Sequence, residues 1–249
     1  LSDMSDTSDL SDNKDWKDAM SNRAITKAAV AKMMDQAVLK PAMTDDDIRR
    51  NAAMCAARGI GDLCVRPTDA ALAAALLEDA GTTVAVVVGF PHGASRSEVK
   101  ALEAKLAIED GADELDMVMN IGKFLSGEYE YVKRDIAAVV AEAKPKGVLV
   151  KVILETALLT LEQVAKACEL AIEAGADFVK TSTGFNGDGA TAEAVEVMLK
   201  TCAGRAKVKP SGGIRDWDTA LRFVRMGADR LGVGSADKIL DGAPAAEGY

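Results

Sequence analysis

Three lysines stand among apolar residues, where we expect little water. They are Lys151 in "VLVKVILE", Lys180 in "DFVKTST" and Lys209 in "AKVKPSG". Desolvation and a neighbouring ammonium group both lower the pKa of a lysine, and a neutral amine can attack a carbonyl carbon to form a Schiff base. We therefore expect Lys180 to be the nucleophile and Lys209 to be the neighbour that suppresses its charge.

An aspartate shares this pattern. Asp116 in "DELDMVM" is also enclosed by apolar residues, and a carboxylate there could carry protons near a carbinolamine. The alternative is a structural ion-pair network, which for a single buried lysine is an equally good interpretation. Three lysines against one aspartate leave the charges unbalanced, and unpaired buried charge is costly, so the sequence favours the Schiff-base site.

Strands must position these side chains. Short apolar runs alternate with amphipathic stretches from residue 33 onward. We predict strands at residues 33–38, 62–65, 83–90, 113–119, 148–155, 177–183, 206–212 and 230–235. Between them, the apolar spacing within 161–172 predicts a helix, and Ser95-x-x-Glu98 and Thr160-x-x-Gln163 have the spacing of capping boxes.

The motif Gly-Ala-Asp recurs at 111–113, 175–177 and 227–229, each time between a predicted helix and a predicted strand. Glycine suits the left-handed residue that follows a helix. Eight near-continuous apolar strands indicate a parallel sheet covered on both faces, and eight is the closing number of a (β/α)8 TIM barrel, an α/β fold of one domain. The competing open, doubly wound sheet usually carries G-x-G-x-x-G after its first strand, and this motif is missing.

The chain ends and composition limit the function further. Residues 1–22, rich in Ser and Asp, are expected to form a disordered acidic tail, followed by the barrel at 23–241 and a flexible C-terminal tail at 242–249. A net charge of −9 without a basic patch argues against nucleic acid and anionic membranes as partners. The four cysteines are widely spaced, and neither a membrane span nor a signal peptide is visible, so we expect a reduced, cytoplasmic protein.

His92 is the only histidine. A Ser-His-Asp hydrolase needs a histidine beside its nucleophile, and catalytic zinc sites usually use two or three, so we expect neither that chemistry nor a metal. His92 itself lies in a predicted loop and is expected to form hydrogen bonds near the strand ends.

Two glycine-rich loops indicate a phosphorylated ligand. "PSGGI" (210–214) follows the seventh predicted strand and "GVGS" (232–235) ends the eighth. Glycines expose backbone N–H groups, and barrels often bind phosphate with the loops after strands seven and eight. The alternative for either loop alone is a tight turn.

Five segments together carry a resemblance to a known family. "VLKP", "VGFPHGA", "GADELDMVMNIG", "FVKTSTG" and "VKPSGGI", in this order between about Met34 and Ser235, resemble the deoxyribose-phosphate aldolases, which are class I aldolases. The resemblance implies reversible cleavage of 2-deoxy-D-ribose 5-phosphate into D-glyceraldehyde 3-phosphate and acetaldehyde through a lysine Schiff base. It also implies that the protein uses no metal or organic cofactor and forms a homodimer.

The resemblance assigns roles to residues. It places the Schiff-base lysine on Lys180, the second lysine on Lys209 and the proton-shuttling aspartate on Asp116, in agreement with the interpretation from burial. It also implies that the following residues bind or support the substrate: Asp35, Cys64, Lys151, Gly213, Gly234 and Ser235. Among these, Lys151 would act electrostatically, Asp35 would contact a substrate hydroxyl, and Cys64 is equally well explained as a small buried residue.

Some positions depart from the family. Gln36 and Ala37 replace a His-Thr pair, and Gly234 replaces a serine, so we expect altered acceptor geometry and weaker phosphate binding. Tyr249 could fold over the site and assist proton transfer, or belong to a disordered end. Two other functions stay open: an aldolase with altered donor or acceptor preference, and a catalytically silent barrel that binds a phosphorylated metabolite. The second would predict a broken lysine pair, whereas Lys180 and Lys209 are both present.

Overall fold

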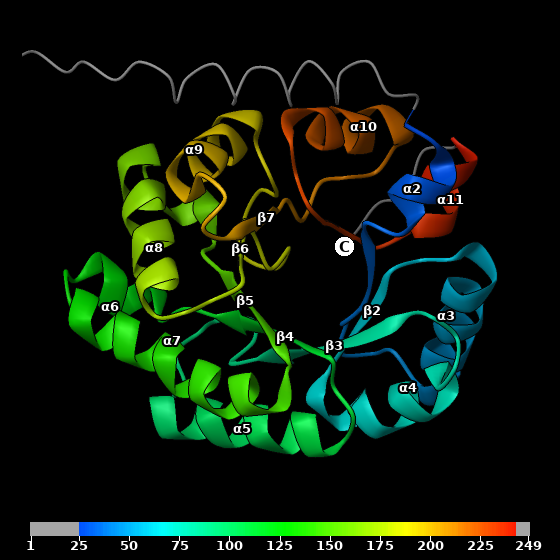
Figure 1. The fold of residues 1–249 in the computed structure, drawn as a ribbon, viewed down its shortest axis with the longest axis horizontal. Coiled ribbons are helices and arrows are strands. Elements are labelled where there is room, and N and C mark those ends of the chain that lie inside the picture. Colours follow the sequence, from blue (N-terminus) through cyan, green and yellow to red (C-terminus); the bar gives the residue numbers. More distant parts are fainter. Residues whose placement is uncertain (1–24, 243–249) are drawn as a thin grey trace, which may run out of the picture.

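Eight short parallel strands lie at the centre of the molecule, as the sequence predicts (Figure 1). The computed structural model describes residues 25–242. The strands are β1 (Met34–Val38), β2 (Asp62–Val65), β3 (Thr83–Val88), β4 (Glu114–Val118), β5 (Leu149–Ile153), β6 (Phe178–Lys180), β7 (Lys207–Lys209) and β8 (Leu231–Val233). Each lies within one of the predicted runs. The predicted strands for β6 and β7 were too long, because the chain beyond Lys180 and Lys209 leaves the regular ladder and forms loops at the ends of the strands.

The sheet closes into a barrel. Its ladder runs in the order β7-β6-β5-β4-β3-β2-β1-β8. The two end strands are joined by a parallel bridge between Ser211 and Gly232, and the N–H of Gly232 donates to the carbonyl of Pro210 at 2.8 Å. The (β/α)8 barrel is therefore confirmed, and the open, doubly wound alternative is wrong.

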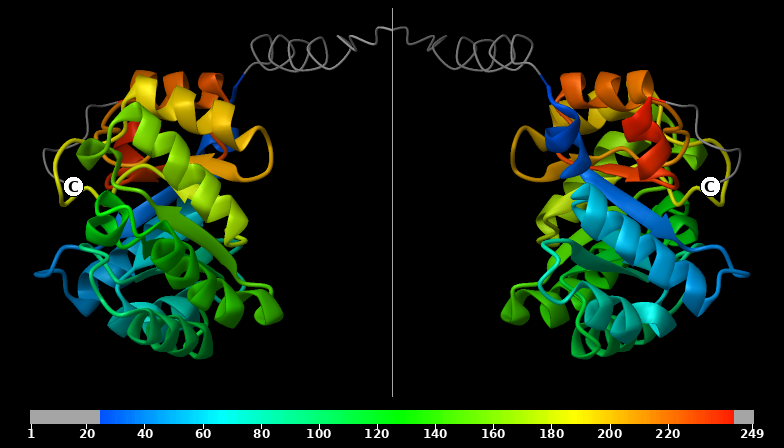
Figure 2. Two further views of the ribbon diagram at one scale, coloured as in Figure 1. Left: turned by 90° about the vertical axis from the view of Figure 1, so that its left-hand side faces the viewer. Right: turned by 90° about the vertical axis from the view of Figure 1, so that its right-hand side faces the viewer.

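Helices surround the strands in a ring, with the strands between them in the side views (Figure 2). The α-helices are α2 (Lys27–Ala31), α3 (Asp45–Arg58), α4 (Ala70–Leu77), α5 (Ser97–Glu109), α6 (Ile121–Leu125), α7 (Tyr129–Ala143), α8 (Leu161–Glu173), α9 (Ala192–Cys202), α10 (Trp217–Met226) and α11 (Ala236–Asp241). Short 3-10 helices are η2 (Pro67–Asp69), η3 (Lys144–Lys146) and η4 (Thr156–Leu158). Within residues 25–242, no helix is both long and apolar enough to cross a membrane.

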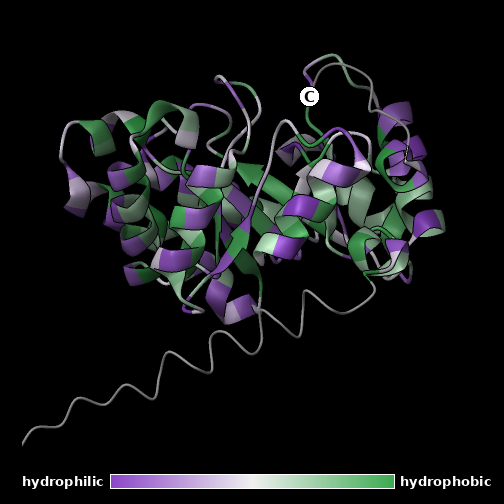
Figure 3. Cartoon of the chain, turned by 90° about the horizontal axis from the view of Figure 1, so that it is seen from above, coloured by the Kyte–Doolittle hydropathy of each residue, from purple (hydrophilic) through white to green (hydrophobic). Residues whose placement is uncertain are grey.

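Apolar periodicity explains how the helices pack. In α8, Val164, Cys168 and Ala171 are buried, as expected for one face of a helix. In Figure 3 the strands at the centre are largely hydrophobic, whereas the surrounding helices carry both hydrophobic and hydrophilic residues. The main core thus lies between the strands and the ring of helices, and the inside of the barrel is free for other side chains.

One of the two predicted capping boxes is present. Thr160 and Gln163 exchange side-chain and backbone hydrogen bonds at the start of α8. The box at Ser95 is wrong, because α5 begins at Ser97 with Arg96 as its N-cap. The hydroxyl of Ser97 donates instead to Asp135 Oδ1 of α7 at 2.8 Å, so a tertiary contact fixes this helix start.

The three Gly-Ala-Asp motifs make the same local structure. Their glycines have φ values of 98°, 89° and 104°, in the left-handed region that favours glycine. The aspartate that follows accepts a hydrogen bond from a backbone N–H near the start of the preceding strand. These bonds are Val84 N to Asp113 Oδ2 at 2.9 Å, Val150 N to Asp177 Oδ2 at 2.8 Å and Val208 N to Asp229 Oδ2 at 2.8 Å.

Side chains inside the barrel are of two kinds. A small apolar cluster, separate from the main core, consists of Ala37, Leu39, Cys64, Ala85 and Val87, with Phe90 packed against it. Charged side chains from further inward-facing positions lie beside this cluster and are described below. The predicted tail at 1–22 and Tyr249 lie outside the described residues, so the domain boundaries and the role of Tyr249 stay predictions.

Candidate active site

Strand register brings the predicted catalytic residues together. Asp116 on β4 pairs with Lys151 on β5, and Lys180 on β6 pairs with Lys209 on β7. Residues paired in this way in a parallel ladder point to the same side of the sheet, which here is the inside of the barrel. All four residues are at most 1% exposed.

Asp116 is the centre of this group. Its Oδ2 lies 2.7 Å from Lys180 Nζ and 2.8 Å from Lys209 Nζ, and its Oδ1 lies 2.8 Å from Lys151 Nζ. Burial alone would raise the pKa of Asp116, but the three ammonium groups lower it well below the usual value. Asp116 is therefore ionised and is the shared counter-ion of these three amines.

Further charges surround this group and form what we term the ionic layer. Among residues 25–242 it comprises four acids and four bases: Asp35, Asp62, Glu114 and Asp116 with Lys151, Lys180, Lys209 and Arg230. The expectation of three lysines facing a single aspartate was wrong. Glu114 lies two residues before Asp116 on one strand, so the period of two could have revealed it.

Arg230 links two of the additional acids. Its Nη1 lies 2.8 Å from Asp35 Oδ1 and its Nη2 lies 2.6 Å from Glu114 Oε1. Burial would lower the pKa of Arg230, but these two carboxylates raise it. Arg230 is the first residue of the strand predicted at 230–235 and directly precedes β8, but the sequence analysis did not identify it as an inward-facing charge.

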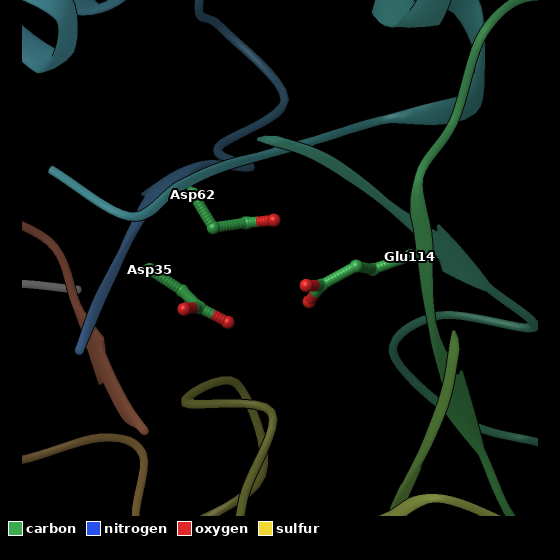
Figure 4. A group of neighbouring side chains, drawn as sticks. All are labelled: Asp35, Asp62 and Glu114. Atoms are coloured by element: carbon green, nitrogen blue, oxygen red, sulfur yellow. The ribbon is translucent and has the colours of Figure 1, made fainter. Parts of the chain in front are cut away.

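Three of the acids converge from different strands. The carboxylates of Asp35, Asp62 and Glu114 point toward one another in Figure 4, with oxygen atoms within 4.8 Å. Asp35 and Glu114 are already in contact with Lys151 and Arg230, so side chains supply the positive charge here. Three carboxylates at this spacing are also the type of group that could hold a cation, but Asp35 and Glu114 already pair with these side-chain cations.

Asp62 differs from its two neighbours. Its Oδ2 accepts a hydrogen bond from Thr83 Oγ1 at 2.9 Å, whereas its Oδ1 has no hydrogen-bond partner among the described residues. Burial first, and then the charge of Asp35, raise the pKa of Asp62 well above its usual value. Burial and the neighbouring carboxylate thus favour the protonated form of Asp62.

Two predicted substrate ligands lie within the ionic layer. Lys151 contacts Asp116, Glu114 and Asp35, and these carboxylates raise its pKa although burial alone would lower it. Asp35 contacts Lys209, Lys151 and Arg230; burial would raise its pKa, but these cations lower it to about 2. This geometry favours a supporting electrostatic role for both residues, and the substrate contact expected of Asp35 stays a prediction.

Cys64 borders both parts of the barrel interior. Its Sγ lies 4.0 Å from Asp116 Oδ2, and it also belongs to the small apolar cluster. Burial first, and then the charge of Asp116, raise the pKa of this thiol to about 12. Cys64 is therefore a neutral, buried side chain next to the carboxylate of Asp116.

The predicted phosphate loops lie side by side at the ends of β7 and β8. Gly212 and Gly213 have φ values of 77° and 75°, which favour glycine, and Gly213 is exposed. Gly189 lies so close that a side-chain carbon on it would meet the backbone of Gly212 at 2.1 Å. After β8, Gly234 is exposed and Ser235 is half-buried. Both loops are therefore available to a ligand at the end of the barrel where Lys180 and Lys209 lie.

The positions that depart from the family are divided between the two sides of β1. Ala37 lies inside the barrel in the small apolar cluster. Gln36 instead contacts Asn51 of α3 and the backbone at Gly234, so it lies on the outer side of the strand. Alternate residues of a strand face opposite sides, so Gln36 reaches the predicted phosphate loop at Gly234 from outside the barrel.

Residues beyond β5 and β6 were missed by the sequence analysis. Glu155 is buried with φ of 57°, unusual for a residue with a side chain, and its Oε1 accepts the backbone N–H of Thr183 at 3.0 Å. Ser182, two residues after Lys180, has a buried hydroxyl without a hydrogen-bond partner among the described residues. Glu155 thus holds the loop after β6 in place. The hydroxyl of Ser182 is a buried polar group at the start of this loop. His92 is exposed in the loop after β3.

Comparisons with known proteins agree with this geometry. The model of the DeoC/LacD family of aldolases matches residues 29–235. The deoxyribose-phosphate aldolase of Thermococcus kodakarensis is 50% identical over 222 residues, which cover 88% of this chain and 99% of that protein. That of Carboxydothermus hydrogenoformans is 46% identical over 227 residues, covering 90% and 100%.

Solved structures agree as well. A putative deoxyribose-phosphate aldolase from Coccidioides immitis is 36% identical with a TM-score of 0.85, covering 92% of this chain and 96% of that chain. The tetrameric deoxyribose phosphate aldolase of Aeropyrum pernix is 33% identical with a TM-score of 0.83 and the same coverage. With its lysine pair on one aspartate at the strand ends of a closed barrel, this chain belongs to the DeoC/LacD family of aldolases.

Proposed function

We propose that this protein is a deoxyribose-phosphate aldolase, which reversibly cleaves 2-deoxy-D-ribose 5-phosphate into D-glyceraldehyde 3-phosphate and acetaldehyde. It is a class I, metal-independent lyase that works through a lysine Schiff base. The observation that carries this proposal is the contact of Lys180 and Lys209 with one oxygen of Asp116. A family match over residues 29–235 supports it.

Lys180 acts as the nucleophile in this mechanism. An ammonium group cannot attack a carbonyl, so Lys180 must lose a proton before it reacts. Its bond to Asp116 Oδ2 at 2.7 Å gives that proton an acceptor, and Lys209 on the same oxygen disfavours a second positive charge. The neutral amine attacks the aldehyde carbon of the open-chain sugar, and Asp116 with a bound water moves protons while the carbinolamine loses water.

The carbon–carbon bond then breaks. The iminium group accepts the electron pair of the bond between sugar carbons 2 and 3, while the 3-hydroxyl loses its proton and becomes the aldehyde of glyceraldehyde 3-phosphate. The enamine left on Lys180 is protonated at carbon 2, and water hydrolyses the resulting imine to acetaldehyde and free lysine. The water molecule lost at the carbinolamine step is thus returned, and no oxidant or reductant is needed.

The substrate phosphate would bind at the ends of β7 and β8. We assign it to the backbone N–H groups of Gly213 and Gly234 and to Ser235. The exposure of Gly213 and Gly234 and the place of all three residues in adjacent loops support this assignment. Since Gly234 has no hydroxyl, one donor fewer is present than in a protein with serine at this position, which predicts weaker phosphate binding.

Trapping the intermediate tests this function. The protein is incubated with acetaldehyde and borohydride, and the modified peptide is located by mass spectrometry. An ethyl group on Lys180 is expected, and it should be absent from the Lys180→Met variant but present in Lys207→Leu, which removes an exposed lysine two residues before Lys209. A folded protein that binds deoxyribose 5-phosphate without any adduct would contradict the proposal and favour the silent barrel.

We propose further that the enzyme is a cytoplasmic homodimer. Exposed Val99, Leu102 and Leu106 lie at helical spacing on α5 and give an apolar surface for a second copy, and the four cysteines are free thiols. Light scattering measures the assembly: a mass of two chains is expected, whereas one or four chains would contradict the dimer.

A further inference from the structure

Gln36 is a buried polar residue that the mechanism does not use. It lies on β1 between Asp35 and Ala37, whose side chains face the inside of the barrel, and it is 3% exposed. Its side chain therefore faces outward, between the strand, α3 and the segment that follows β8. A buried amide needs hydrogen-bond partners, and its choice of partners shows what it holds in place.

The amide of Gln36 binds the backbone on both sides of Ser235. Its Oε1 accepts the N–H of Ala236 at 2.9 Å, and its Nε2 donates to the carbonyl of Gly234 at 3.0 Å. These contacts join residues about 200 positions apart in the chain. A single side chain thus fixes both peptide groups that border Ser235.

Asn51 determines which way this amide points. The Nδ2 of Asn51 donates to the carbonyl of Asp47 at 2.8 Å, so its Oδ1 is turned toward Gln36. That Oδ1 accepts from Gln36 Nε2 at 3.1 Å, which leaves Gln36 Oε1 for the N–H of Ala236. The donors and acceptors are consistent in only one orientation of each amide.

This arrangement has a consequence for Ser235. Ser235 is the N-cap of α11, but its side chain makes no capping hydrogen bond to that helix. The N–H of Ala236, the first residue of α11, is satisfied by Gln36 of β1. The hydroxyl of Ser235 is not used to cap α11, and Gln36 holds the backbone on both sides of it.

We propose that Gln36 is a positioning residue for the substrate phosphate. It holds Gly234 and Ser235 in the conformation that presents them to the phosphate, and it does so without touching the substrate. This proposal rests on the proposed function and on the phosphate site assigned above. It predicts that Gln36 determines the preference of the enzyme for a phosphorylated over an unphosphorylated sugar.

Gln36→Met tests this role, because methionine has a similar length and no hydrogen-bonding amide. The N–H of Ala236 and the carbonyl of Gly234 lose their partner, so the loop shifts and contacts to the phosphate weaken. We measure kcat/KM for 2-deoxyribose 5-phosphate and for 2-deoxyribose. The ratio of the two values is expected to fall about tenfold, the effect of losing roughly one hydrogen bond to a charged group.

Thr82→Val serves as the matched control. Thr82 is buried, and its hydroxyl donates to the carbonyl of Ile60 at 2.8 Å before β3, at the opposite end of the barrel strands. This variant also loses one buried hydrogen bond between a side chain and the backbone. It should lower the melting temperature to a similar extent and leave the substrate ratio unchanged. An equal loss with both sugars in Gln36→Met, as in the control, would show a merely structural role and overturn the proposal.

Asn51→Ala gives a second, milder test. It keeps Gln36 but removes the oxygen that orients its amide, so the ratio should fall by less than in Gln36→Met. The inhibition constant of inorganic phosphate should rise in the same order across the variants. Wild-type protein that cleaves neither sugar would refute the proposed function. Wild-type cleavage with an unchanged ratio in both variants would refute only the role of Gln36.

Discussion

Lys180 and Lys209 bind the same oxygen, Asp116 Oδ2, at 2.7 and 2.8 Å. The two amines come from neighbouring strands and are paired in register, so their proximity is built into the sheet. A second positive charge beside Lys180 makes its neutral form easier to reach, which is what attack on an aldehyde requires.

Lys209→Leu should therefore slow the enzyme at neutral pH. Without the neighbouring ammonium, Lys180 holds its proton more tightly, and we expect kcat/KM to fall about a hundredfold or more, with partial recovery as the pH is raised. A pH profile of kcat/KM measures this. Lys207→Leu on the same strand is the control and should behave like the wild type, because Lys207 is exposed and lies over the ring of Phe178. Unchanged activity of Lys209→Leu at pH 7 would rule out the assigned role.

Asp116→Asn should reduce both activity and stability. The variant keeps the shape of the side chain but leaves three ammonium groups without their shared carboxylate, and breaking buried ion pairs in this way costs about 3–5 kcal/mol. Loss of the proton acceptor should also lower kcat by about a hundredfold. Denaturant unfolding and steady-state kinetics measure the two effects separately. A variant of normal stability and normal kcat would show that Asp116 is neither the proton carrier nor the counter-ion.

The wild type should lose folding stability as the pH rises and Asp62 ionises, and the Asp62→Asn variant should not show this loss. The pKa of Asp62 is raised in the folded protein, so its protonated form contributes stability that is fully present below the pKa of an unfolded aspartate, about 3.9. This contribution is lost as the pH rises through the folded-state pKa. Asparagine is neutral at every pH and keeps an oxygen for Thr83.

The difference in unfolding free energy between Asp62→Asn and the wild type should therefore shift in favour of the variant as the pH rises. Urea unfolding between pH 5 and 9 measures it. Asp218→Asn on the exposed side of α10 is the control and should show no such trend. A constant difference across the range would show that Asp62 does not titrate between pH 5 and 9 and would contradict this prediction.

The repeating strands and their turns were the predictable part of the fold. Apolar runs and the three Gly-Ala-Asp motifs are local signals, and they placed all eight strands. The lysine pair and Asp116 were also visible, because a charge in an apolar run is costly without a purpose. The length of β6 and the start of α5 were not, since loops and tertiary contacts such as Ser97 to Asp135 override local pattern there.

The ionic layer was harder to predict than the proposed catalytic residues. Asp62 and Arg230 are adjacent to Asp35 and Glu114 only through barrel closure and register, which one sequence does not specify. Gln36 is different: once Asp35 was assigned to the inside, alternation along β1 already placed Gln36 outside. The partners of Gln36 in α3 and beyond β8 still required the structure.

The Gly-Ala-Asp aspartates also link the strands in pairs. Each aspartate precedes one strand and accepts a backbone hydrogen bond from the strand before it, which joins β3 with β4, β5 with β6 and β7 with β8. None of these three bonds crosses the connection between β4 and β5. A chain cut there would yield an N-terminal half that keeps the bond from Val84 to Asp113 and a C-terminal half that keeps the other two. Two separately expressed halves would each keep their own aspartate hydrogen bonds between strands. We therefore expect them to reassemble into one barrel.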